Sequence, residues 1–152
     1  MDLTTTDENG MPWDFSKAEQ RNKAIRRWHE EKHLFIIGTP MCTAFSILQQ
    51  WNYPKMDPQK VAAKMKEARM HLEFCVQIYR MQVNSGRYFI HEHPKGTTSW
   101  KEPMVERMSK EEGVITVNSD MCAFGLKTKD GDKEGYGQLR RENGCKRMKR
   151  CG

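Results

Sequence analysis

The chain has 152 residues, of which 37% are hydrophobic and 30% are charged, so its length and composition suit one domain with a modest core. No run approaches the roughly eighteen apolar residues of a membrane helix, and the polar start MDLTTTDENG lacks the features of a signal or transit peptide, so we expect no membrane association and a cytoplasmic or nuclear setting. Five widely spaced cysteines without a CxxC pair argue against a disulfide framework or a zinc finger.

The formal net charge of +6 is concentrated near the C-terminal end of the sequence. The last thirteen residues, RRENGCKRMKRCG, contain six Lys or Arg and one Glu. We therefore predict a single domain over residues 1–139 and a basic tail over 140–152. Such a tail is either a solvated, disordered end or a segment that binds nucleic acid through counterion release. Its candidate contact residues are Arg140, Arg141, Lys146, Arg147, Lys149 and Arg150.

The N-terminal half predicts a helix, a strand and a second, short helix. A capping box of Ser16 and Glu19 favours a helix that ends near residue 32. The apolar run LFIIG at 34–38 predicts a buried, parallel strand. A short helix over 43–51 is expected after the Pro-Met-Cys turn.

The strongest helical signal follows this segment. Asp57 is a suitable cap, Pro58 stands at the favoured first position, and apolar residues recur at steps of three and four from Val61 to Val83. The remaining elements are expected as a strand over 87–93, a helix from about Trp100 to Glu111 that opens with a capping box of Ser99 and Glu102, a strand over VITVNSD and a turn at Asp130-Gly131.

Alternation of strands and helices predicts a three-layer α/β domain with a mostly parallel sheet. In such sheets, ligands bind beyond the carboxyl ends of the strands. Three polar or reactive segments are expected there, namely 39–42 (Thr-Pro-Met-Cys), 91–94 (His-Glu-His-Pro) and 119–122 (Ser-Asp-Met-Cys). The sequence therefore predicts a site at this edge.

The segment GTPMCTAFS at 38–46 resembles the catalytic segment of cytosine-5 DNA methyltransferases, typically Gly-Gly-Pro-Pro-Cys-Gln-x-Phe-Ser. In that family the next strand ends in Glu-Asn-Val, and YFIHEHP places Glu92 at the corresponding position. The wider pattern also resembles methyltransferase-like segments of retroelement polyproteins. PWDFS at 12–16, HLEF at 71–74, GRYFIHEHP at 86–94 and DMCAFG at 120–125 carry this second resemblance.

The resemblance implies a partial Rossmann-like methyltransferase fold in which Cys42 is the nucleophile and Glu92 its partner. Thr39, Pro40, Ser46 and Asp120 would line the pocket, S-adenosylmethionine would be the cofactor, DNA would be the partner and no metal is expected. The chain departs from the family in two respects. Pro-Pro-Cys has become Pro-Met-Cys, and the glycine-rich cofactor turn is absent. We therefore expect an incomplete domain that is weakly active or inactive alone.

Structural or non-enzymatic interpretations stand beside each of these expectations. Cys42 is either a thiolate or a small residue packed under a turn, and Glu92 is either a substrate contact or a solvated strand-end acid. His91 and His93 share one strand face, which permits a metal site if Asp120, Cys122 or Cys42 completes it, although packed histidines are the simpler interpretation. The alternative function is a non-enzymatic or mobile-element-derived protein that binds nucleic acid through its basic tail. The sequence gives no indication of oligomeric state.

Overall fold

The computed structural model describes residues 6–119 and 145–150. None of the helices in these two stretches combines the length and apolar content needed to cross a bilayer. The elements in chain order are α1 (Ala18–Glu31), β1 (Phe35–Gly38), η1 (Thr43–Phe45), α2 (Ile47–Asn52), η2 (Tyr53–Lys55), α3 (Pro58–Asn84), β2 (Tyr88–Pro94), η3 (Thr98–Lys101), α4 (Pro103–Ser109), β3 (Val114–Ser119) and β4 (Cys145–Arg150), where η denotes a 3-10 helix.

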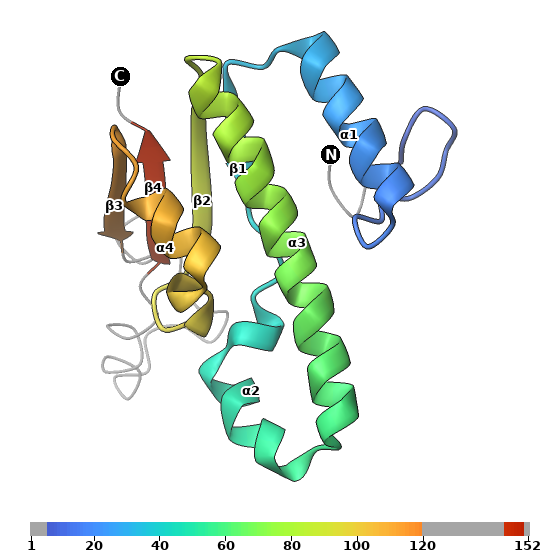
Figure 1. The fold of residues 1–152 in the computed structure, drawn as a ribbon, viewed down its shortest axis with the longest axis vertical. Coiled ribbons are helices and arrows are strands. Elements are labelled where there is room, and N and C mark those ends of the chain that lie inside the picture. Colours follow the sequence, from blue (N-terminus) through green and yellow to red (C-terminus); the bar gives the residue numbers. More distant parts are fainter. Residues whose placement is uncertain (1–5, 120–144, 151–152) are drawn as a thin grey trace, which may run out of the picture.

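The protein has a mixed α/β fold built on a four-stranded sheet in the order β1-β2-β4-β3 (Figure 1). β1 and β2 pair in parallel, as the sequence predicts, with Gly38 opposite His91. β4 pairs antiparallel with both β2 and β3, so β3 points in the same direction as β1 and β2. One of the three pairings is therefore parallel.

β4 is the main difference between the predicted and observed chain organisation. Residues 145–150 belong to the segment that was expected to be a disordered basic tail, but they form a strand with a partner on each side. The strand CKRMKR has no apolar alternation, so period-two patterning gives no signal for it. Its place in the sheet is set by pairing with distant segments rather than by its own sequence.

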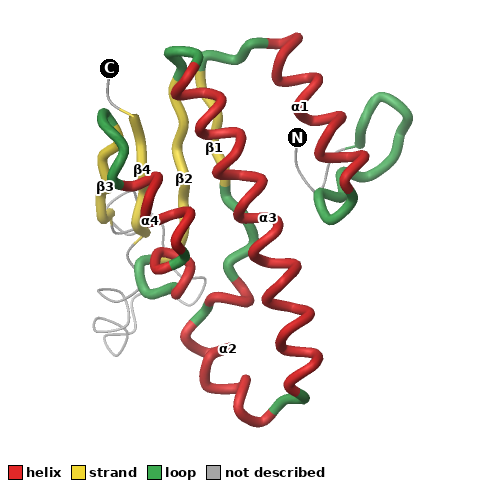
Figure 2. The backbone as a smooth tube through the Cα atoms, viewed as in Figure 1, coloured by secondary structure: helices red, strands yellow, loops and turns green. Residues whose placement is uncertain are grey.

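Helices α3 and α4 lie on the same side of the sheet (Figure 2). The core between these layers contains buried apolar residues from α3, α4, β2, β3 and η1. Its members are Phe45, Leu72, Val76, Tyr79, Phe89, Val105, Met108 and Val114. The predicted apolar face of α3 supplies much of this core, because Leu72 and Tyr79 are buried and Cys75 packs against them.

The other face of the sheet is open in the described residues. Phe35, Ile37, Ile115 and Val117 have relative exposures of 39–62%. The expectation that 34–38 is a buried strand is therefore wrong for one of its faces, since its residues alternate between exposed and half-buried. The described residues place helices on one face only, and the predicted three-layer arrangement is not seen in them.

A second apolar cluster joins α1 to the outer side of α3. Trp13, Ala24, Trp28, Phe74 and Ile78 are buried there. The heptad-like stripe of the sequence identified one face of α3, but this helix packs on two sides. Phe74 and Ile78 lie outside the predicted apolar stripe but are buried, so the sequence pattern underestimates how much of α3 is buried.

Of the three helix caps that the sequence predicts, one forms and two do not. Asp57 Oδ1 accepts a hydrogen bond of 2.8 Å from the amide of Gln59, so α3 is capped as expected. Ser16 does not cap α1, because its hydroxyl donates to Asp14. Ser99 does not cap a helix from residue 100, because the chain forms the 3-10 turn η3 and then α4, whose N-cap position is Glu102.

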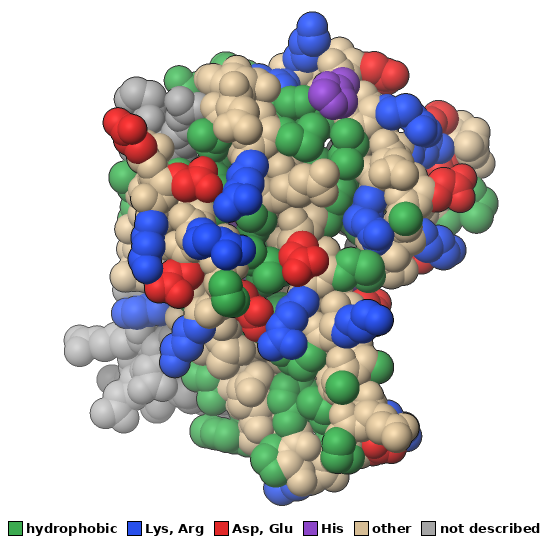
Figure 3. Space-filling model, viewed as in Figure 1, with side chains coloured by type: hydrophobic (Ala, Val, Ile, Leu, Met, Phe, Trp, Pro, Cys, Tyr) green, Lys and Arg blue, Asp and Glu red, His purple; other side chains and the backbone are tan. Residues whose placement is uncertain are grey.

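The helix-covered face carries charges of both signs (Figure 3). Two ion pairs join α3 to residues around α4: Arg69 with Glu102 at 3.1 Å and Arg80 with Glu111 at 3.5 Å. Exposed pairs of this kind contribute little to stability. Because the charges alternate in sign, this side of the molecule is not a uniformly basic surface.

Candidate active site at the carboxyl ends of strands β1 and β2

Cys42 lies in the loop that leaves the carboxyl end of β1. The loop ends at η1, where Phe45 is buried in the core and its amide donates a 2.9 Å hydrogen bond to the carbonyl of Cys42. Cys42 is a free, half-buried cysteine. A buried aromatic side chain three residues later thus anchors the loop that carries the thiol.

The helix expected over 43–51 is divided at Ser46. Ser46 has extended backbone angles, and its hydroxyl oxygen accepts a 3.2 Å hydrogen bond from Gln49, which makes it the N-cap of α2. Between Cys42 and Ser46 there is only the three-residue turn η1. No α-helix therefore begins directly after Cys42 to stabilise a thiolate there with its positive end, and Ser46 has a capping role.

Glu92 lies on β2, one residue beyond the position where β2 pairs with the last residue of β1. Its side chain is half-buried and takes part in interactions, and its backbone is in register with Arg147 of β4. Cys42 therefore follows β1, and Glu92 lies near the carboxyl end of the adjacent parallel strand β2, at the same end of the sheet. Neither is sealed in the interior.

His91 and His93 lie on the opposite face of β2 from Glu92, under the helices, and are 0% and 1% exposed. The hydroxyl of Tyr79 lies 3.0 Å from Nδ1 of His91, whose Nε2 has no hydrogen-bond partner in the described structure. Burial, together with the neighbouring His93, lowers the pKa of His91 to about 3. Burial also lowers the pKa of His93, although its hydrogen bond to Pro40 opposes this effect.

The two nitrogens of His93 contact the Pro40 carbonyl and the Ser99 hydroxyl. In the described residues no group of three or more histidine, cysteine or carboxylate side chains could hold a metal ion. Asp120 and Cys122, which were considered as further ligands, lie outside the described residues.

The remaining predicted site residues are distributed as follows. Thr39 and Pro40 belong to the loop that also carries Cys42, and the Pro40 carbonyl is held by His93. Asp120, Arg140 and Arg141 lie outside the described residues. Lys146, Arg147, Lys149 and Arg150 are in β4. The structure thus brings the Cys42 loop together with β2 but does not describe the third predicted segment.

A hollow that the sequence did not predict lies at the other end of the strands. This open depression, about 520 Å³ in volume, is lined by Trp28, His29, Lys32, Met81, Asn84, Ser85 and Arg87. It lies where α1 and α3 end, and Lys32 takes a left-handed conformation there with φ 47°. Basic side chains beside two helix C-termini complement the helix dipoles, which accounts for their presence without a ligand.

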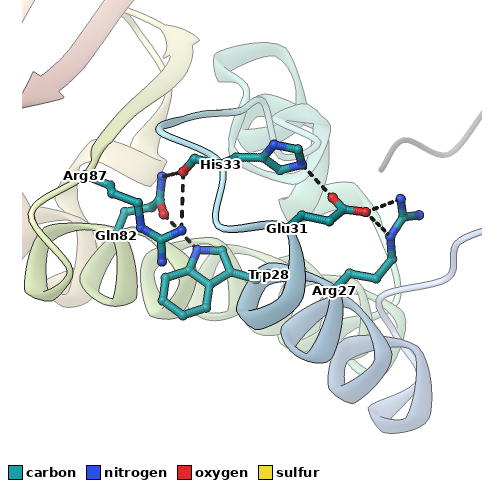
Figure 4. Close-up of polar contacts among 6 residues, drawn as sticks. All are labelled: Arg27, Trp28, Glu31, His33, Gln82 and Arg87. Atoms are coloured by element: carbon teal, nitrogen blue, oxygen red, sulfur yellow. Dashed lines mark hydrogen bonds and ion pairs between the residues drawn. The ribbon is translucent and has the colours of Figure 1, made fainter.

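Hydrogen bonds around the indole of Trp28 hold this end of the molecule together (Figure 4). Trp28 Nε1 donates to Gln82 Oε1 at 2.8 Å, and the amide nitrogen of the fully buried Gln82 donates to the carbonyls of His33 and Tyr88. The guanidinium of Arg87 lies 4.1 Å from the centre of the indole ring. Trp28 therefore anchors packing between α1, α3 and the starts of β1 and β2.

Comparisons of the chain with protein-family models, with curated proteins and with solved structures found no match. The site must therefore be interpreted from its own residues.

The described residues do not fit an S-adenosylmethionine site. The hollow lined by Trp28, Lys32 and Arg87 lies at the opposite end of the strands from Cys42. The arrangement offers a thiol and a carboxylate, and we derive no chemical step through the cofactor.

Proposed function

We propose that this chain is a methyltransferase-like fragment related to DNA cytosine methylation, with Cys42 as nucleophile and Glu92 as the residue that holds the ring edge of cytosine. The observation that supports this proposal is that two half-buried residues, Cys42 and Glu92, lie towards the carboxyl ends of adjacent parallel strands, where α/β sheets bind ligands. The order of the two residues in the sequence matches the resemblance to the methyltransferase motifs.

The chemistry assigned to these residues is addition to a pyrimidine ring. Cys42 Sγ, as the thiolate, forms a bond to carbon 6, and the electron pair of the carbon 5–carbon 6 double bond moves to carbon 5. Glu92 hydrogen-bonds the ring edge and stabilises this adduct. The target base must leave the duplex to reach the two side chains, so single-stranded DNA is the easier substrate. S-adenosylmethionine would supply the methyl group, but we propose no methyl transfer by this chain alone.

Hydrogen exchange at carbon 5 of cytosine tests this chemistry without a cofactor. If carbon 5 of the adduct takes up a deuteron from heavy water and the original proton leaves as the thiolate is expelled, intact cytosine is recovered with deuterium at carbon 5. We expect incorporation into single-stranded DNA with the wild-type chain and none with Cys42→Ser. Cys75→Ser is the matched control, because Cys75 is a half-buried thiol that packs against the core and whose pKa burial raises to about 11. Equal incorporation by both variants, or none by the wild type, contradicts the proposal. A parallel assay with labelled S-adenosylmethionine asks whether methyl transfer occurs at all.

The composition of β4 favours a second candidate function, which is non-enzymatic binding of nucleic acid. Four of the six residues in this strand are Lys or Arg, and the strand pairs with β2 and β3. Deleting the strand would remove a partner of both β2 and β3, so charge substitutions are the better test. Arg147→Gln combined with Lys149→Gln should reduce the salt dependence of DNA retention by about 1.4–1.8 in log-log slope if both residues contact phosphates. An unchanged slope rejects contacts through these two residues.

A further inference from the structure

His93 connects the loop of Cys42 to two other parts of the chain. Its ring is 1% exposed, with Nε2 at 2.6 Å from the Pro40 carbonyl and Nδ1 at 2.6 Å from the Ser99 hydroxyl. Pro40 precedes Cys42 by two residues, and Ser99 belongs to η3. One buried side chain on β2 therefore holds both the loop after β1 and the segment before α4.

The partners of His93 determine which nitrogen carries the proton. A carbonyl oxygen only accepts, so Nε2 must donate to Pro40, and in the neutral ring Nδ1 must accept from Ser99. The Ser99 oxygen lies 2.7 Å from the Thr97 hydroxyl, which can donate to it. The Thr97 hydroxyl also lies 3.0 Å from the carbonyl of Pro94, which already accepts from the amide of Thr97 and the indole of Trp100 at 3.1 and 2.9 Å. Because the single hydroxyl proton of Ser99 is donated to His93, the 2.7 Å contact between the two hydroxyl oxygens requires the proton of Thr97 to point at Ser99.

The result is a chain of three hydrogen bonds with one direction, from Thr97 to Ser99, from Ser99 to His93 and from His93 to Pro40. The imidazole of His91 and the indole of Trp100 lie beside His93, with ring centres 4.7 and 6.3 Å from that of His93. Burial of His93 agrees with a neutral imidazole near pH 7.

We propose that His93 is a positioning residue that holds the loop of residues 39–42, and through it the Cys42 thiol, at the carboxyl end of β1. The proposal adds a residue to the site described under the proposed function and depends on that function for its catalytic meaning. Neutral His93 does this by donating to the Pro40 carbonyl, and the Thr97–Ser99 pair keeps the ring in the required tautomer. His93 has no assigned contact with the substrate.

His91 offers a matched control, because it lies on the same strand and face, is equally buried and contacts the hydroxyl of Tyr79 on α3. In the full chain, we expect His93→Phe to accelerate both alkylation of Cys42 by iodoacetamide and amide exchange at Phe45 by roughly fivefold to tenfold, the effect of losing one buried hydrogen bond. His91→Phe should leave both rates within about twofold. Alkylation of Cys75, which lies on α3 and packs against the core, is followed by mass spectrometry of its peptide and monitors unfolding of α3 from the core.

Two further variants separate positioning from a general loss of packing. His93→Gln retains one donor and one acceptor and should restore most of the slow amide exchange at Phe45. Ser99→Ala removes the hydroxyl that keeps the His93 ring in the required tautomer and should give an intermediate exchange rate. If His93→Phe does not fold, these two variants carry the test. Equal rates in the His93 and His91 variants, or no rescue by Gln, overturn the proposal. If the rates of Cys42 alkylation and Phe45 amide exchange depend on His93 but no deuterium enters cytosine, the positioning role stands and the proposed function fails.

Discussion

The change Gly38→Ala tests a close approach between the backbone of β1 and the buried side chain of Tyr79. A Cβ at Gly38 would lie 1.7 Å from the hydroxyl oxygen of Tyr79 and 2.7 Å from its ring carbon Cζ. Tyr79 cannot move aside freely, because it is 1% exposed, stacks on Phe89 with ring centres 4.6 Å apart and hydrogen-bonds His91. Overpacking of a core costs about 1–3 kcal/mol, and loss of the Tyr79–His91 hydrogen bond adds about 1 kcal/mol. We expect Gly38→Ala to lower the free energy of unfolding by about 2–4 kcal/mol.

The assay is urea unfolding followed by tryptophan fluorescence, with Gly96→Ala as the matched control. A Cβ at Gly96 would meet only the tip of the flexible Ile47 side chain, at 3.0 Å, so this variant should lose less than about 1 kcal/mol. The double variant with Tyr79→Phe should regain part of the loss, because it removes the atom that lies closest to the new methyl group. A Gly38→Ala protein as stable as Gly96→Ala would refute the packing argument.

Two other changes probe a helix cap and a buried histidine. Asp57→Ala should lower the free energy of unfolding by about 1 kcal/mol, because α3 loses its N-cap. Ser16→Ala removes no cap and should change the free energy of unfolding by less than about 0.5 kcal/mol. Paired urea titrations measure both values. His91 has a lowered pKa in the folded state, so the unfolded chain binds a proton first as the pH falls. Its contribution to stability is complete above about 6.5 and is lost progressively towards 3, at up to about 1.4 kcal/mol per pH unit. The urea midpoint of unfolding should therefore depend less steeply on pH between 3 and 7 in His91→Phe than in the wild type. An unchanged pH dependence would contradict a neutral buried ring.

Local sequence signals were sufficient where a single segment determines its own structure. The cap at Asp57, Pro58 at the first position and the regular apolar steps defined α3, and the run before Gly38 defined β1 as parallel to β2. The signals failed where a tertiary contact outcompetes them. The hydroxyl of Ser99 has the spacing of a capping box, but it hydrogen-bonds His93 instead, and the helix therefore starts later.

The candidate site was predictable as a place but not as a set of contacts. Alternation of strands and helices predicts that β1 and β2 are parallel, so that their carboxyl ends, with Cys42 after β1 and Glu92 on β2, lie at one edge of the sheet. The hydrogen bond between His93 and Pro40 spans 53 residues of sequence, and no periodicity encodes such a contact. β4 shows the same limit, since a strand of mainly basic residues is recognised only once its neighbours are known.

The position of β4 has a consequence for synthesis of the protein. β4 comes from the C-terminal part of the sequence, yet it lies between two strands that are made earlier. During translation β2 and β3 therefore leave the ribosome with the facing backbone amides and carbonyls unpaired, and the sheet closes only when residues 145–150 have emerged. Until then the nascent chain exposes two strand edges whose backbone hydrogen-bonding groups are unpaired. Stalled or prematurely terminated products are therefore prone to aggregation.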